Sequence, residues 1–306
     1  MKRISLILPF ILLAFCMDAA TFAGGRLEDR TLRLDYIFSG TDKTCDIALA
    51  HLKSLDGWAG RRVNLDTLPL RGNGQLTMTD KATGDTLYCT SFSTLFQEWQ
   101  ATEEATRIRR SFENVFLVPM PSAPVEIHVQ LFDFHDDIVA SMSHSVDPSD
   151  ILIKPSGGWK SGEGAAAGKD GQFWRVLHHG GSPEEKIDVV ILAEGYTAPE
   201  IEIFYSDARA AVESLFAHEP FGTMRDCFNI VALGVPSRES GVSVPRDGVW
   251  KETAVGSHFD TFYSDRYLTT PELFRMHDVL SDIPYEHIIV LANTDTYGGG
   301  GIYNSY

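Results

Sequence analysis

The run IDVVIL, residues 187–192, decides the fold of the second half of this 306-residue chain. Apart from Asp188 it is apolar without alternation, which is typical of a strand covered on both faces in a parallel or mixed sheet. Residues 228–235 and 287–292 give two further apolar strands of the same kind. Such strands, separated by longer segments, predict an α/β domain with helices against its sheet.

Two helices are expected between these strands. Thr197-Ala198-Pro199-Glu200 has the spacing of a capping box, with the proline near the first turn where its missing N–H is harmless. The residues after it place apolar side chains on one helical face, namely Phe204, Ala208, Ala211, Val212, Leu215 and Phe216. A second helix is expected from Thr270 and Pro271 to about Ile283. The first strand, helix and second strand should form a right-handed β-α-β unit.

The first half has a different pattern, with short runs in which β-branched and aromatic residues alternate with polar ones. Regularly spaced strands with little helix predict an all-β sandwich. Residues 80–84, DKATG, are expected to form a hairpin loop in which Gly84 supplies a positive φ. Two segments, Cys45–Leu55 and Ser93–Thr106, fit either short helices or broad connections.

The N-terminus has the three parts of a secretory signal peptide, which we place at residues 1–23. Met1-Lys2-Arg3 precedes an apolar run that ends at Phe15, and cleavage is expected after Ala20 or Ala23. The protein is therefore expected to be secreted or periplasmic. Acylation of Cys16, as in a lipoprotein, is the alternative. No later stretch is apolar for long enough to cross a bilayer.

Composition divides the rest of the chain into domains and excludes one class of partner. Residues 24–154 form the β-sandwich domain, 155–186 a Gly/Ser-rich linker that begins PSGGWKSGEGAAAGKDG, and 187–306 an α/β domain that looks incomplete. The formal net charge is −16, with 26 Lys and Arg against 42 Asp and Glu. This balance leaves no basic stripe for a phosphate backbone, so nucleic acid is not an expected partner.

Three cysteines, Cys45, Cys89 and Cys227, remain after the signal peptide. Their odd number and wide spacing exclude a disulfide framework and a Cys-x-x-Cys metal site. Cys45 and Cys89 either pair in an oxidising compartment or remain free thiols.

A search for catalytic motifs finds one partial match. A zinc peptidase needs His-Glu-x-x-His on a helix, because residues four apart direct two imidazoles at one metal. The stretch His218-Glu219-Pro220-Phe221-Gly222 fails at the last position, and its proline would interrupt a helix. We therefore expect a helix end packed by Phe221.

The other histidines and nucleophiles give no site either. His178-His179, His258 with Asp260, and His277 with Asp278 each lack a third ligand. A Gly-x-Ser-x-Gly motif is absent, so a hydrolase that uses Ser or Cys has no support in the sequence. The residues alone predict no catalytic group and no metal ligand.

Specific segments resemble a known family. From residue 187 on, IDVVILAEGYT, FAHEPF, SGVSVP, SHFDTFYSDRYLTT and PYEHIIVLANTDTYGGGGIYNSY resemble the IgA-peptidase family of secreted zinc metallopeptidases. In the first domain, GWAGRR, GQLTMTDKATGDTLY, TSFSTLFQEW, SFENVFLVP and DPSDILI resemble the N-terminal β-sandwich domain of that family.

The resemblance implies a zincin-like α/β domain and zinc-dependent cleavage of protein or peptide substrates. The family's His-Glu-x-x-His helix, with its catalytic Glu and a further ligand downstream, follows the tyrosine- and glycine-rich segment. This chain ends at Tyr306. No zinc ligand or catalytic residue carries over, so we expect a truncated member that binds no zinc and is inactive as given.

The resemblance does imply a substrate-side segment, in which a peptide adds as a strand to a sheet edge. The residues expected to bind substrate are Tyr297, Gly298, Gly299, Gly300, Gly301, Tyr303 and Asn304. The glycine run lacks the spacing of a nucleotide-binding loop, and a plain flexible loop is its alternative. The alternative function is a secreted binding protein whose sandwich domain holds protein or glycan. Trp58 and Trp99 are then contact residues unless they pack in the core. The sequence does not indicate the oligomeric state.

Overall fold

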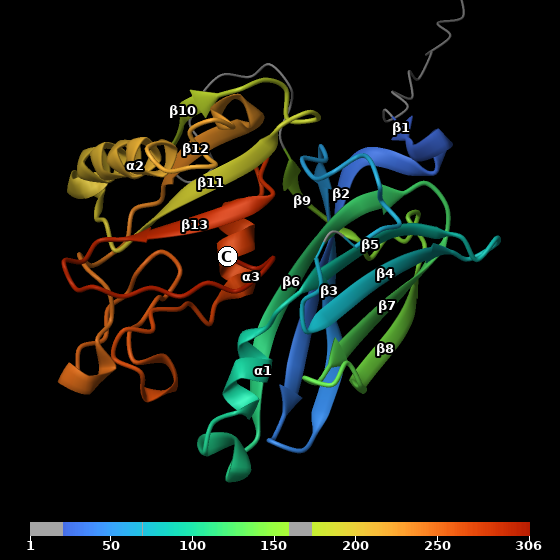
Figure 1. The fold of residues 1–306 in the computed structure, drawn as a ribbon, viewed down its shortest axis with the longest axis horizontal. Coiled ribbons are helices and arrows are strands. Elements are labelled where there is room, and N and C mark those ends of the chain that lie inside the picture. The colour runs from blue at the N-terminus through green and yellow to red at the C-terminus, as the bar shows by residue number, and fades with distance from the viewer. Residues whose placement is uncertain (1–20, 69, 159–172) are drawn as a thin grey trace, which may run out of the picture.

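A computed structural model describes residues 21–68, 70–158 and 173–306. It contains a β domain and an α/β domain that lie side by side (Figure 1). Residues 1–20 of the expected signal peptide and residues 159–172 of the expected linker lie outside the described residues. No helix in the described ranges has the length and apolar character needed to cross a membrane.

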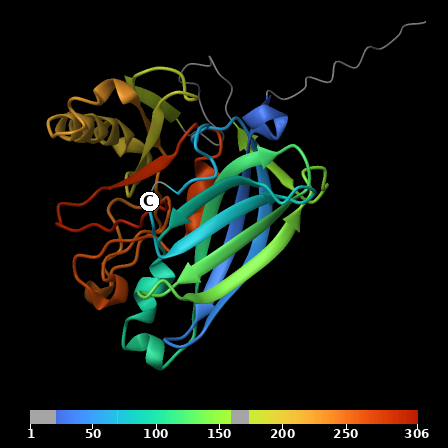
Figure 2. The same ribbon diagram turned by 45° about the vertical axis from the view of Figure 1, so that its right-hand side comes forward.

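The first domain consists of two sheets around one core. In the first sheet, β2 (Leu27–Gly40) pairs antiparallel with β1 (Thr21–Phe22), β3 (Cys45–Asp56) and β6 (Arg110–Pro121), and β9 (Lys154–Gly158) pairs with β3. The second sheet has the order β5 (Thr86–Phe92), β4 (Gly74–Asp80), β7 (Val125–Phe132) and β8 (Ile138–Val146). Figure 2 shows one sheet lying over the other. The expected N-terminal β domain is present.

Alternation along the strands fills this core. On β2, Leu32, Leu34 and Tyr36 point inward and are fully buried. Trp58 and Trp99 are also buried, at 3% and 0% exposure. Core packing is therefore confirmed for both tryptophans, and they do not form an exposed binding surface.

The structure corrects the prediction for Cys45–Leu55, which was wrong, because this segment lies in strand β3 and is neither a helix nor a connection. β3 pairs with β2 along nearly its whole length, from Cys45 opposite Gly40 to Asp56 opposite Arg30. The register shifts between Asp35 and Tyr36, where Ala50 is the extra residue on β3. This bulge interrupts the alternation in the sequence.

The segment Ser93–Thr106 contains a short helix, α1 (Leu95–Gln100), as one of its two predicted alternatives. Thr94 caps it, because its hydroxyl accepts a hydrogen bond from the Gln97 N–H at 3.1 Å. The hairpin loop at residues 80–84 is confirmed, with Gly84 at a φ of +79°. Cys45, Cys89 and Cys227 are free thiols.

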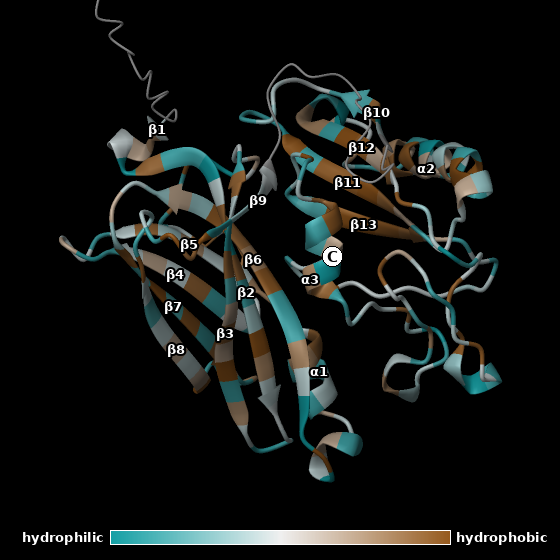
Figure 3. Cartoon of the chain, turned by 180° about the vertical axis from the view of Figure 1, so that it is seen from behind, coloured by the Kyte–Doolittle hydropathy of each residue, from teal (hydrophilic) through white to brown (hydrophobic). Residues whose placement is uncertain are grey.

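The second domain has a four-stranded mixed sheet in the order β10 (Phe173–His179), β12 (Phe228–Gly234), β11 (Ile187–Glu194) and β13 (His287–Ala292). β11 runs parallel to β12 and β13, and β10 runs antiparallel to β12. The three predicted strands are confirmed, and Figure 3 shows them as strongly apolar. All of β10, and β9 except for its first residue Lys154, lie inside the range 155–186 expected to be a linker.

One helix packs on each face of this sheet. α2 (Ile201–Phe216) covers one face with Phe204, Ala208 and Val212, and the predicted capping box of Thr197 and Glu200 precedes it. The hydrogen bonds from Thr197 lower the pKa of Glu200 to about 2.

α3 (Leu273–Val279) lies on the other face and is shorter than the predicted 270–283. Thr270 and Pro271 stay outside the helix, because the Thr270 hydroxyl donates to the Val255 carbonyl and accepts from the Glu272 N–H.

Candidate functional site

The candidate segment, residues 297–304, leaves the carboxyl end of the parallel strands. Ligands of open α/β sheets commonly bind at this end. Glu194 and Ala292 are neighbours in register at the ends of β11 and β13. Asn293 then donates its N–H to the Glu194 carbonyl at 2.8 Å and its side-chain amide to the Gly195 carbonyl at 3.0 Å. The start of the segment is thereby tied to the sheet.

The glycine run lies against the chain's own residues 266–268. Gly299 donates its N–H to the Arg266 carbonyl at 2.9 Å and accepts from the Leu268 N–H at 3.5 Å. A Cβ added at Gly298 would lie 2.7 Å from the Arg266 carbonyl oxygen, and one at Gly300 would lie 2.8 Å from that of Leu268. These two glycines are therefore needed for internal packing, and the segment is not a free loop.

The other side of the run is open. A Cβ at Gly299 or Gly301 would meet no atom within 4 Å. Within the described ranges, the N–H groups of Gly298, Gly300 and Gly301 have no hydrogen-bond partner. Tyr297 is 81% exposed, and the Arg266 guanidinium lies 5.7 Å from the centre of its ring. An aromatic ring and unused backbone donors are therefore available together at this surface.

Tyr303 and Asn304 lie elsewhere, at the junction of the two domains. The Tyr303 carbonyl accepts from the Ser93 N–H at 2.9 Å, and the Asn304 amide donates to the Ser91 carbonyl at 2.6 Å. Both residues line a cavity of about 350 Å³, together with Trp58, Tyr88 and other residues of both domains. The seven predicted residues thus divide into an open group, 297–301, and a junction group, 303–304.

A buried carboxyl group supports the loops around the open group, and the sequence analysis missed it. Glu194 is fully buried at the end of β11. It accepts hydrogen bonds from the Thr253 hydroxyl at 2.6 Å, the Ser257 N–H at 2.7 Å and the Val255 N–H at 2.9 Å. The sequence signal was an acidic residue directly after an apolar strand. Glu194 fixes the course of residues 253–257, which lead into the loop beneath the glycine run.

A pair of carboxyl groups, Asp188 and Glu286, lies at the opposite end of the strands. The Glu286 N–H donates to the Asp188 carbonyl at 2.8 Å, and the Asp188 N–H donates to the Glu286 carboxyl at 3.3 Å. Asn229 donates to one carboxyl oxygen of Asp188, while the other is buried without a partner in the described structure. Burial raises the pKa of Asp188 to about 7 and that of Glu286 to about 7.

This pair predicts a pH-dependent stability. Between about pH 4 and about pH 7, Asp188 is ionised in the unfolded chain but protonated in the folded one, so its contribution to stability falls as the pH rises. Asp188→Asn has no proton to lose. The free energy of unfolding of the variant minus that of the wild type should therefore increase from about pH 5 to about pH 7, by at most about 1.4 kcal/mol per pH unit, and level off by about pH 8. Urea unfolding across this range measures it.

Asp147→Asn is the matched control, because Asp147 is exposed and hydrogen bonds from Ser149 lower its pKa. The free energy of unfolding of Asp147→Asn should differ from that of the wild type by a constant amount over the same pH range. A constant difference for Asp188→Asn as well would show that Asp188 is already ionised in the folded protein.

The histidines considered in the sequence take structural roles. His277 is buried and bonded to the Tyr285 hydroxyl at 2.7 Å, and His178 contacts the Arg225 carbonyl at 3.0 Å. His218 contacts the Ser214 carbonyl, and Phe221 packs on Phe228 after the end of α2, as expected. His258 contacts the carbonyl of Phe259, the next residue.

These contacts do not form a metal site. Among the described residues, no three His, Cys, Asp or Glu side chains are grouped so that they could hold a metal ion. The side chains of this part of the chain therefore do not provide a ligand set for a zinc ion.

Comparison with known families gives two matches. Residues 176–306 match the family model described as IgA Peptidase M64, and residues 25–143 match the one described as Peptidase M64 N-terminus. The two matches follow each other in the chain and fall on the α/β domain and the β domain. No curated protein matches this chain.

Proposed function

Because this chain belongs to the IgA Peptidase M64 family, we propose that it functions in the hydrolysis of peptide bonds in protein substrates, as a zincin-like metallopeptidase chain. The observation that carries this proposal is the pair of family matches, which span both domains in order. The family is a metallopeptidase family, so zinc is the plausible metal of its intact members.

The role proposed for residues 1–306 is narrower than that of the family. A His-Glu-x-x-His motif does not occur in this sequence, and the described residues offer no ligand set for zinc. We propose that these residues bind and position the substrate, and that by themselves they do not hydrolyse it.

The proposed substrate site is the open side of residues 297–301. An extended peptide would add alongside the glycine run, where the unused N–H groups of Gly298 and Gly300 donate to its carbonyls. Tyr297 supplies an exposed aromatic contact for a substrate side chain. Gly299 keeps the run attached to residues 266–268, so the site is held in place before the peptide arrives.

Fluorescence anisotropy with short labelled peptides from an unfolded protein tests this site. Peptides with alternate N-methylated amides should bind at least about tenfold more weakly, because they cannot pair as a strand. Tyr297→Ala should also weaken binding of the unmethylated peptides by about tenfold. Tyr263→Ala is the matched control, since Tyr263 is an equally exposed tyrosine outside the segment. Equal binding of both peptide types, or equal effects of both variants, would contradict the proposed site.

We also propose export through the N-terminal signal sequence. Strand β1 supports cleavage after Ala20 in preference to Ala23, because Phe22 pairs with Leu27 and its ring lies 4.9 Å from the Arg62 guanidinium. Intact-mass measurement of the exported protein should give Thr21 as its first residue, and an uncleaved chain would contradict export by this route.

A further inference from the structure

Strand β6 belongs to two hydrophobic cores at once. Its residues Phe116, Val118 and Met120 point into the core of the first domain. The alternate residues point the other way, and Val115, which is 5% exposed, is part of the core of the second domain, with Leu117 packed against it. In the second domain, α3 packs on the sheet face that carries Leu192 and Leu233, and Val115 of β6 joins the same core from the first domain.

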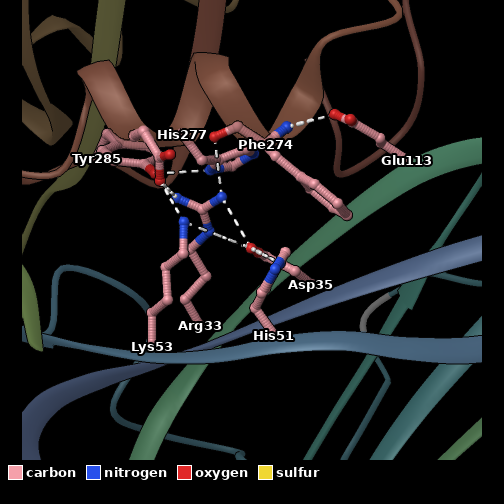
Figure 4. Close-up of polar contacts among 9 residues, drawn as sticks. Arg33, Asp35, His51, Lys53, Glu113, Phe274, His277 and Tyr285 are labelled. Carbon is pink, nitrogen blue, oxygen red and sulfur yellow. Dashed lines mark hydrogen bonds and ion pairs between the residues drawn. The ribbon is translucent and has the colours of Figure 1, made fainter. Parts of the chain in front are cut away.

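A polar cluster lies beside this shared strand, with Arg33 and Asp35 fully buried and the Asp278 side chain 49% exposed (Figure 4). Arg33 on β2 donates to both carboxyl oxygens of Asp35, to the Asp278 carboxyl at 2.6 Å and to the Phe274 carbonyl at 2.9 Å. Lys53 on β3 donates to the same Asp278 oxygen at 2.5 Å. Every donor side chain comes from the first domain, while Asp278 and Phe274 belong to α3 of the second.

Burial of this cluster depends on the second domain. Arg33 and Asp35 alternate with the core residues Leu32 and Leu34, so they lie on the outer face of the first sheet. Both are nevertheless 0% exposed. Two cations, Arg33 and Lys53, face one carboxylate of their own domain, and Asp278 brings the second. Arg33 and Lys53 thus both donate to a carboxylate that only the second domain supplies.

Further contacts fix the orientation of the two domains. The Phe274 N–H, at the start of α3, donates to the Glu113 carboxyl of β6 at 2.7 Å. The Tyr267 hydroxyl donates a hydrogen bond to the Glu98 carboxyl group, which belongs to α1 of the first domain. Tyr303 and Asn304 bond to Ser93 and Ser91, as described above. The domains thus meet through apolar, charged and backbone contacts at separate places.

We infer that the first domain is a built-in scaffold on which the second domain completes its core. The dependence is one-sided. The first domain has a core of its own between its two sheets, whereas the core of the second domain includes Val115 of β6, which the second domain alone would lack. This role is independent of peptide hydrolysis and assigns the β domain a function other than substrate recognition.

Cleavage of the folded full-length chain tests the inference. A specific protease site is inserted within residues 161–168, and the purified protein is cut after folding. The two fragments should elute together in size-exclusion chromatography at about micromolar concentration, and should unfold in one transition. The inference is overturned if the fragments separate and the second one still resists proteolysis and unfolds cooperatively.

Single substitutions test whether Val115 and the charged cluster carry the interaction between the two domains. Val115→Asp in the full chain should leave the first domain folded but make the second domain sensitive to protease. Val139→Asp is the matched control, because Val139 is an exposed valine on strand β8. In the cut protein, Lys53→Met and Asp278→Asn should each raise the dissociation constant at least about tenfold, and together by less than the product of the two effects. Equal behaviour of the two valine variants, or independent effects of the two charge variants, would contradict a shared core and a shared cluster.

Discussion

Replacing Arg33 with alanine is expected to destabilise the full-length protein by at least about 3 kcal/mol, because it removes one partner of a buried charge cluster. Arg33 uses its guanidinium to bond Asp35, Asp278 and the Phe274 carbonyl. Without it, the fully buried Asp35 carboxylate would lose its hydrogen-bonded cation, and Lys53 would remain 3.7 Å away. Urea unfolding measures the loss.

Arg238→Ala is the control for this prediction. Arg238 also forms an ion pair, at 2.7 Å from Glu252, but its side chain is largely exposed. Exposed pairs contribute about 1 kcal/mol or less, so this variant should differ little from the wild type. Similar losses for the two arginine variants would mean that the buried cluster does not hold the domains together.

Replacing Glu194 with alanine is expected to lower the free energy of unfolding by at least about 3 kcal/mol, because it leaves three buried donors without a partner and each costs about 1–3 kcal/mol. The Val255 and Ser257 N–H groups and the Thr253 hydroxyl would all lose their acceptor. Glu194→Gln keeps the shape and one acceptor oxygen, so its loss should be smaller. Urea unfolding gives both values.

The same substitution should loosen the loop that supports the glycine run. Amide hydrogen exchange in residues 253–268 should become faster in Glu194→Ala. Exchange in strand β7, which belongs to the first domain, should not change. A variant with wild-type stability and wild-type exchange in this loop would show that Glu194 does not organise it.

Much of the fold could be predicted because local sequence and tertiary structure agree there. The apolar runs of β11, β12 and β13 reflect burial on both faces, and the Thr197–Glu200 box marks the start of α2. Segments whose structure depends on a distant partner were harder. β3 contains a bulge at Ala50, which interrupts the alternation of its side chains. β9 lies in a glycine-rich range whose composition predicts a linker, and its strand structure depends on pairing with β3.

The site was predictable in its residue types but not in its geometry. The glycine run indicated a close backbone approach, and the approach is real, but Gly298 and Gly300 make it to residues 266–268 of the same chain. Tyr303 and Asn304 are separated from the run because their partners, Ser93 and Ser91, lie in the first domain.

The burial of Arg33 and Asp35 could not be predicted either, because it depends on residues far away in the sequence. Their alternation with apolar residues predicts that they face solvent on one side of a strand. In the structure, α3 packs against them and both are buried. Glu194 likewise reads as a polar strand end, because its donors lie about 60 residues further along the chain.

We propose that residues 1–306 bind a peptide substrate and do not by themselves form a zinc centre. The most direct measurement combines zinc content and cleavage of an unfolded protein substrate by the purified chain, with and without a chelator. We predict far less than one zinc ion per chain and no cleavage that the chelator abolishes. One tightly bound zinc ion per chain, together with cleavage that stops when the chelator is added, would show that these residues form an active metal centre.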